Sequence, residues 1–185
     1  MRACRLLRRG SAPAFPSCQA GAPVHETPNG ILATAREVGL PSTRFRQVGP
    51  TRFAAVLDRI LETFTRGGIA NRDSLWLWDD LQEPCHALIR PDVCRVIRQV
   101  APASTPVWFM TEDHGRTKRH SNYWLFEGDL GAVVDVIENH YHMEYYVVSR
   151  KLDWMLLENH HDVLYGVGEW IVARLHAIEA TSSNP

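Results

Sequence analysis

The segment MEYYVVSRKLDWMLLENH, which starts at Met143, constrains the fold more than any other part of the chain. It holds two apolar runs, 143–149 and 153–158, that are rich in Tyr, Val, Trp and Leu and are joined by the short link RKLD. Two short runs of this kind around a tight link predict a β-hairpin. The chain should therefore contain an antiparallel sheet.

The rest of the sequence supplies further strands and helices around this hairpin. The pattern predicts strands at 74–79, 85–89, 106–111 and 122–127, and helices at 28–38, at 52–66, from Asp92 to Ala101, from Asp129 as N-cap to Tyr141, and from Asp162 or Gly168 to Ala180. Hairpins interspersed with helices are typical of an α+β fold. We expect an antiparallel sheet of about five to six strands with helices packed on one face, and two helices N-terminal to it.

Length and composition favour one domain. The 185 residues contain 45% hydrophobic and 22% charged residues, which is usual for a folded globular chain. Residues 1–27 hold four Arg and one acid, and their Ala, Pro, Ser and Gly content predicts a disordered basic leader. We place a single α+β domain at 28–180 and a disordered tail at 181–185.

Charge and cysteine spacing narrow the functional classes. Residues 1–72 carry a net charge of +7 and residues 73–185 a net charge of −8. The acidic part argues against a nucleic-acid partner, although the segment EDHGRTKRHSN at 112–122 is locally basic. The sequence has no apolar run long enough to span a membrane, and its four cysteines form no CxxC pair. A reduced, cytoplasmic protein is the expectation.

Histidines and acids gather at the two ends of the predicted hairpin. The tripeptide Glu-Asn-His occurs at 138–140 and again at 158–160. Because the two ends of a hairpin are adjacent, both copies could contribute to one site. Imidazole and carboxylate are ligands for zinc, manganese or iron, and they are also acid/base groups. The candidates are Glu158, His160 and His161 as catalytic residues and His140, His142, His160 and Asp162 as metal ligands, whereas the structural alternative is that they cap strand and helix ends.

A second group of residues is suited to binding a protein. Aromatic side chains next to acids are frequent anchors for cationic partners. The predicted partner-binding residues are Trp76, Trp78, Asp79, Asp80, Glu112 and Asp113.

The stretches VWFMTED, YWLFEGDL and EYYVVSRKLDWMLLENHHDVLYGVG resemble a small set of uncharacterised bacterial proteins. The resemblance covers about residues 74–175. It implies a bacterial, cytoplasmic setting and no activity. Small acidic α+β proteins of this type are often immunity proteins that neutralise a toxin, an analogy of class and size.

Three functional hypotheses follow. The first is a non-enzymatic binding protein of immunity or regulatory type, which needs no cofactor and holds a cationic protein such as a toxin on an acidic aromatic surface. The alternative is a hydrolase with its site at the ends of the 143–158 hairpin, of either a metal-assisted or an acid/base type. The metal-assisted type would use a divalent metal as its cofactor. The third is a homodimer without another ligand.

Overall fold

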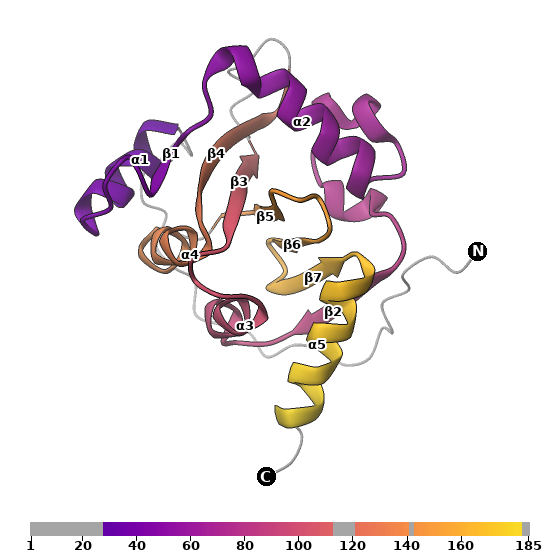
Figure 1. Ribbon diagram of the computed structural model, residues 1–185. Helices are drawn as coiled ribbons and strands as arrows, with labels where there is room; N and C mark the ends of the chain where they lie inside the picture. The colour runs from indigo at the N-terminus through magenta and orange to yellow at the C-terminus, as the bar shows by residue number, and fades with distance from the viewer. Residues whose placement is uncertain (1–27, 113–120, 141–142, 183–185) are drawn as a thin grey trace, which may run out of the picture.

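A single antiparallel sheet forms the centre of the molecule (Figure 1). The computed structural model describes residues 28–112, 121–140 and 143–182. Within these residues the sheet has seven strands in the order β1-β4-β3-β5-β6-β7-β2. The strands are β1 (Phe45–Gln47), β2 (Cys85–Ile89), β3 (Pro106–Glu112), β4 (Tyr123–Asp129), β5 (Tyr145–Ser149), β6 (Met155–Glu158) and β7 (Val163–Val167).

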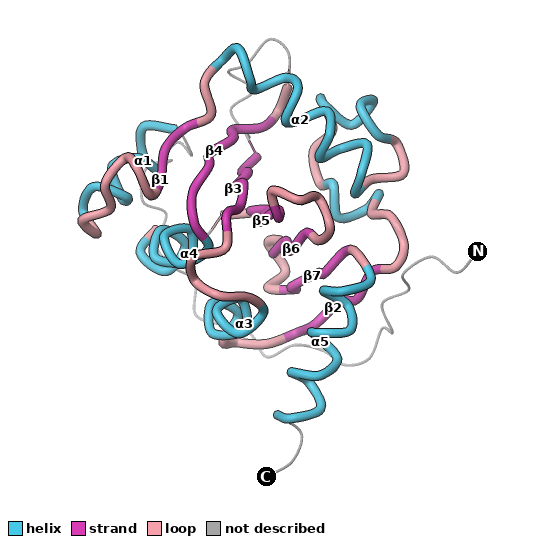
Figure 2. The backbone as a smooth tube through the Cα atoms, viewed as in Figure 1, coloured by secondary structure: helices cyan, strands magenta, loops and turns pink. Residues whose placement is uncertain are grey.

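Helices cover both faces of this sheet (Figure 2). One face packs against α1 (Pro28–Glu37), α3 (Val93–Val100), α4 (Leu130–Asn139) and α5 (Glu169–Ser182). The other face packs against α2 (Pro50–Phe64) and the neighbouring 3₁₀ turn η2 (Leu77–Asp80), with η1 (Gly68–Asp73) between them in the chain. The sequence led us to expect helices on one face of the sheet. Four helices share one face, and α2 covers the opposite face.

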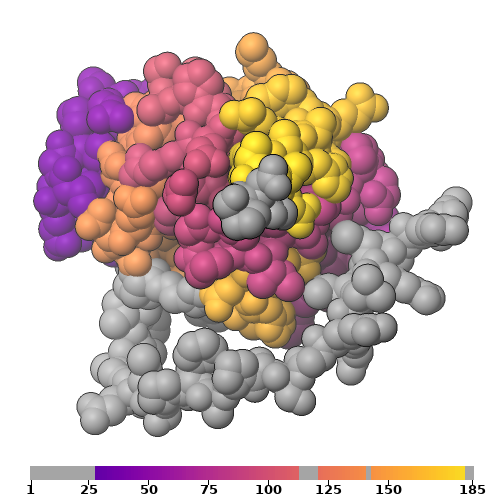
Figure 3. All heavy atoms as spheres, turned by 90° about the horizontal axis from the view of Figure 1, so that it is seen from below, coloured from indigo at the N-terminus to yellow at the C-terminus, as the bar shows by residue number. Residues whose placement is uncertain are grey.

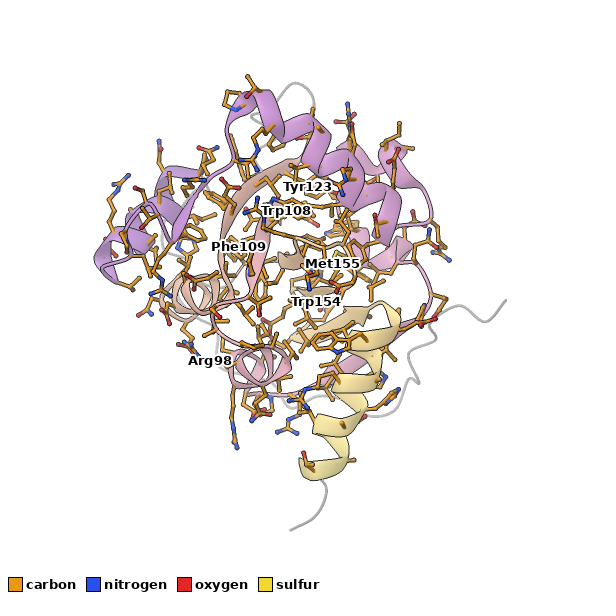
Figure 4. The ribbon with its side chains drawn as sticks, viewed as in Figure 1. Arg98, Trp108, Phe109, Tyr123, Trp154 and Met155 are labelled. Carbon is orange, nitrogen blue, oxygen red and sulfur yellow. The ribbon has the colours of Figure 1, made fainter. Side chains whose placement is uncertain are left out.

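Strand alternation explains the two hydrophobic cores. In β3, Phe109 belongs to the core under α4, whereas Trp108 and Met110 belong to the core under α2. Figure 4 shows residues of both cores, with Trp108 and Tyr123 on the side of α2. A strand buried on both faces has no polar alternation. This is why 106–111 reads as one continuous apolar run.

The α+β fold is confirmed, and so are its best-defined local features. Strands β5 and β6 pair antiparallel, with Tyr145 opposite Glu158, as the hairpin prediction required. Strands β3 and β4 form the second expected hairpin. Asp129 is the N-cap of α4, because its Oδ1 accepts the backbone N–H of Ala132 at 2.8 Å.

The predicted strand at 74–79 is wrong. Residues 77–80 form η2, and Trp76 before it has a left-handed backbone with φ 65°. The segment pairs with no strand of the described sheet, and the chain at its end is held against the end of α2. The N–H of Arg66 donates to Asp80 O and the N–H of Gln82 donates to Phe64 O, both at 2.9 Å.

The segment ENHHD is also placed differently from the prediction. Its residues 159–162 form the turn between β6 and β7, and Glu158 ends β6. The sequence predicted neither β7 nor the three-residue β1. Asp162 has φ 56° in this turn and caps no helix, and α5 begins at Glu169. The buried Asn159 fixes the turn, because its Oδ1 accepts the backbone N–H groups of His161 and Val163.

Candidate functional site

Three acids lie at one edge of the sheet because of the strand register. Thr111 in β3 is opposite Tyr145 in β5, and Tyr145 is opposite Glu158 in β6. The end of β3, the start of β5 and the end of β6 are therefore neighbours. This arrangement places Glu112 and Glu144 on the α2 face of this edge and Glu158 on the opposite face.

Glu112 is fully buried on the α2 side of the sheet. Its Oε1 accepts the hydroxyl of Tyr146 at 2.5 Å and the backbone N–H of Trp76 at 3.1 Å. Burial is the largest of the causes that together raise the pKa of Glu112 to about 7. The charge of Glu144 and a hydrogen bond shared with it also raise this pKa, whereas the hydrogen bonds from Tyr146 and Trp76 lower it. Between about pH 4.5 and pH 7, Glu112 thus holds a proton that an ordinary glutamate has lost.

Glu144 links this buried acid to the surface. Its side chain is 4% exposed, and its Oε1 accepts the backbone N–H of His160 at 3.0 Å and lies in hydrogen-bond contact with the Nδ1 of the same residue. A carboxylate only accepts hydrogen bonds, so Nδ1 of the imidazole carries the proton of this contact. The side chain of His160 is 45% exposed. We call Tyr146, Glu112, Glu144 and His160 the acid relay.

The segment before η2 closes the buried end of the acid relay. The backbone N–H of Asn122 donates to Arg72 O at 2.9 Å, and the hydroxyl of Tyr123 donates to Ser74 O at 2.5 Å. These bonds hold the chain so that the N–H of Trp76 reaches Glu112. Non-glycine residues with positive φ are uncommon and concentrate at functional sites, which fits the left-handed Trp76.

Aromatic rings surround the exposed end of the acid relay. The ring of Trp78 meets His160 at a centroid distance of 6.1 Å and His161 at 5.9 Å, in both cases edge to face. The two imidazoles lie 3.9 Å apart. His160 is therefore held by Glu144 below it and by two rings beside it.

The opposite face of the same sheet edge has a pocket of about 680 Å³. The hydroxyl of Tyr145 donates to Glu158 in this pocket, and Nδ1 of His140 lies 2.7 Å from Oγ1 of Thr34. Burial lowers the pKa of His140, so its imidazole is neutral at pH 7. The other side chains that line the pocket come from α3 and the segment before it, the end of α4 and the turn after β6, and include Arg90, Asp92, Cys94, Arg95, Glu138 and Asp162.

The two Glu-Asn-His copies that the sequence placed in one site meet only in part. His140 of the first copy and Glu158 of the second line the pocket with Asp162, whereas His160 belongs to the acid relay on the α2 side. Within the described residues, one group of side chains has its potential ligand atoms close enough together to hold a metal ion, and it contains none of these residues. His142 lies outside the described residues, so metal binding by the full set stays a prediction.

The predicted partner-binding residues are divided between surface and interior. Trp76 is 49% exposed and Asp79 is exposed, but Glu112 is buried in the acid relay. Asp80 binds Arg66 at 3.0 Å and also accepts from Asn71 and the N–H of Gly67. Asp113 and the basic segment 113–120 lie outside the described residues. The exposed part of the predicted surface is therefore smaller than the sequence suggested.

The acid relay was only partly predictable. The sequence analysis named Glu112 and His160, but for different sites, and did not select Tyr146. Strand parity is the signal that could have joined them, because Glu144 and Tyr146 share a face of one strand and Glu112 shares a face with Met110. The register that makes these faces meet is not visible in the sequence.

The fold and the acid relay define an α+β protein with a buried carboxyl pair that ends at a surface histidine. The chain belongs to a family of unknown function, DUF6756, which matches residues 29–179. No curated protein and no solved structure matches it. Within the described part of the chain, every helix is too short or too polar to cross a lipid bilayer.

Proposed function

We propose that the acid relay is the catalytic site of an acid/base hydrolase with His160 as its general base and acid. The observation that carries the proposal is the buried carboxyl pair that ends in a half-exposed imidazole. A carboxylate behind an imidazole fixes its tautomer and orientation and stabilises the imidazolium form. Glu144 has this position relative to His160.

The proton transfers follow from the assigned tautomer. Nε2 of His160 takes a proton from a water molecule while the water oxygen bonds to the carbonyl or phosphoryl centre of the substrate. The imidazolium then returns the proton to the leaving group as its bond breaks. Below about pH 7, Glu112 is mostly protonated, so it adds no negative charge beside Glu144.

Substrate contacts would come from the ring of Trp78 beside His160. Trp78 is half-buried, so part of its ring can contact a bound molecule. His161 offers a matched control, because it is the adjacent residue and the same side-chain type but makes no hydrogen bond to Glu144 through its backbone N–H, which donates to Asn159.

The test is hydrolysis of p-nitrophenyl acetate, p-nitrophenyl butyrate and bis(p-nitrophenyl) phosphate by the full chain. We expect turnover of at least one ester, loss of turnover in His160→Gln, and a decrease of about 100-fold or more in Glu144→Gln. His161→Gln should keep most of the activity. Absence of turnover with all three probes, or full activity in a folded His160→Gln variant, contradicts the proposal.

A second candidate function, non-enzymatic binding of a cationic protein, is favoured by one observation. Trp76 is a large aromatic residue that is 49% exposed on a strained backbone, next to the exposed Asp79. The net charge of −8 after residue 72 suits a cationic partner such as a toxin, and a bacterial cytoplasmic location belongs to this proposal. Co-purification from the host should recover a basic protein with the natural chain and not with the Trp76→Ala variant. The control is Glu62→Lys on the exposed face of α2, which should reduce this recovery little. Equal recovery with Trp76→Ala excludes this surface.

A further inference from the structure

A third group of polar side chains lies far along the sheet from the acid relay, where α5 crosses the edge strand β2 (Figures 1 and 3). It consists of His86 in β2 and of His176 and Glu179 in α5. One imidazole nitrogen from each histidine and one oxygen of Glu179 all lie within 4.8 Å of one another. These are the ligand types that bind divalent transition metals.

The local structure explains why these side chains meet. His176 and Glu179 are three residues apart in a helix, so they project from the same face. His86 is directly opposite Gly166 of β7. A Cβ atom at Gly166 would lie 2.5 Å from Cδ1 of Leu175, so the absence of a side chain there allows α5 to approach the sheet. The close approach places the ligand-bearing face of α5 over His86.

The distances are near those of a metal site. Nε2 of His86 lies 3.3 Å and Nδ1 of His176 lies 3.9 Å from Oε2 of Glu179. Ligand atoms about 2.0–2.1 Å from a tetrahedral zinc ion are about 3.3–3.4 Å apart. A small rotation of the half-exposed Glu179 and His176 side chains would complete this geometry.

We propose that His86, His176 and Glu179 bind one divalent transition-metal ion of the zinc type and thereby fasten α5 to β2. Three protein ligands leave a fourth position for water. The acid relay takes no part in this site, so the proposal is independent of hydrolysis.

An ordinary ion pair between histidine and glutamate is the simpler account of the same contacts, but the arrangement of the two imidazoles favours a metal. Their rings lie 4.0 Å apart, which is unfavourable for two charged rings and favourable for two ligands of one ion.

The test is titration of the untagged, chelator-treated full chain with zinc chloride, followed by calorimetry, and with cobalt chloride, followed by its visible absorption. We expect one ion per chain, tetrahedral cobalt bands, and a raised melting temperature with zinc. His176→Ala and Glu179→Gln change exposed helix positions that should leave folding intact. Each should weaken zinc binding by about 100-fold or more, since even changes behind a metal ligand cost about 10–100-fold.

His160→Ala and His161→Ala are the controls, because they remove imidazoles at the other histidine cluster. Both should bind zinc as the natural chain does. The proposal is overturned if no zinc binds at millimolar concentration, if His176→Ala binds with unchanged affinity, or if His160→Ala abolishes binding.

Discussion

Replacement of Glu112 by Gln should make the protein more stable above neutral pH. The folded pKa of Glu112 is about 7, against an ordinary value of 4.5, and burial is the largest cause. A carboxyl with a raised folded pKa favours folding only while it is protonated, so its contribution is lost as the pH rises from about 4.5 to about 7. At about 1.4 kcal/mol for each pH unit, this loss amounts to about 3 kcal/mol.

Glutamine keeps the geometry without the charge. Its carbonyl oxygen can accept from Tyr146 and Trp76, and its N–H can donate to Glu144, as the protonated acid does. The Glu112→Gln variant should therefore match the natural chain near pH 4.5 and exceed its unfolding free energy by about 3 kcal/mol near pH 8.

Urea unfolding at several pH values measures this difference directly. Titrating groups that do not interact with Glu112 contribute equally to both chains, so they cancel in the comparison. Glu62→Gln, an exposed position on α2, is the control and should change stability little at any pH. If Glu112→Gln shows the same pH dependence as the natural chain, or is less stable near pH 8, the assignment of a buried proton to Glu112 is refuted.

Two further predictions concern packing and capping. Gly166→Ala should destabilise the fold by about 1–3 kcal/mol because the new Cβ would overlap Leu175. Thermal unfolding should show a lower melting temperature for this variant. An unchanged melting temperature contradicts the close approach of α5 to the sheet. Asp129→Ala removes the oxygen that accepts the Ala132 N–H, so we expect a loss of about 0.5–2 kcal/mol in urea unfolding, and Asp129→Asn should restore part of it.

Features set by neighbouring residues were predictable from the sequence. The apolar stripe of α2, the cap at Asp129 and the hairpin of β5 and β6 depend on spacings of a few residues, and the structure contains all three. The prediction of a strand from the aromatic run at 74–79 was wrong because it also used only neighbouring residues. Local composition favoured a strand, but Leu77 and Leu81 pack in the core under α2, and this tertiary contact requires the turn that begins at Trp76.

The candidate site depends on information that is not local. A hairpin brings its two ends together, and this much of the reasoning about His140 and His160 was sound. It did not decide which face of the sheet each side chain occupies, and the turn at Asn159 places His160 beside Glu144, on the face opposite to the pocket. The pairing of Glu112 with Glu144 needs the register between β3 and β5, which are more than thirty residues apart in the chain.

In the acid relay, Glu144 holds the imidazole of His160 with the proton on Nδ1. Nitrogen-detected or proton–nitrogen NMR of ¹⁵N-histidine-labelled protein measures the tautomer of each imidazole, and His160→Gln assigns the signal. We expect an Nδ1–H tautomer for His160 with a strongly downfield proton, and loss of that signal in Glu144→Gln but not in His161→Gln. An Nε2–H tautomer, or a His160 signal that Glu144→Gln leaves unchanged, contradicts the acid relay.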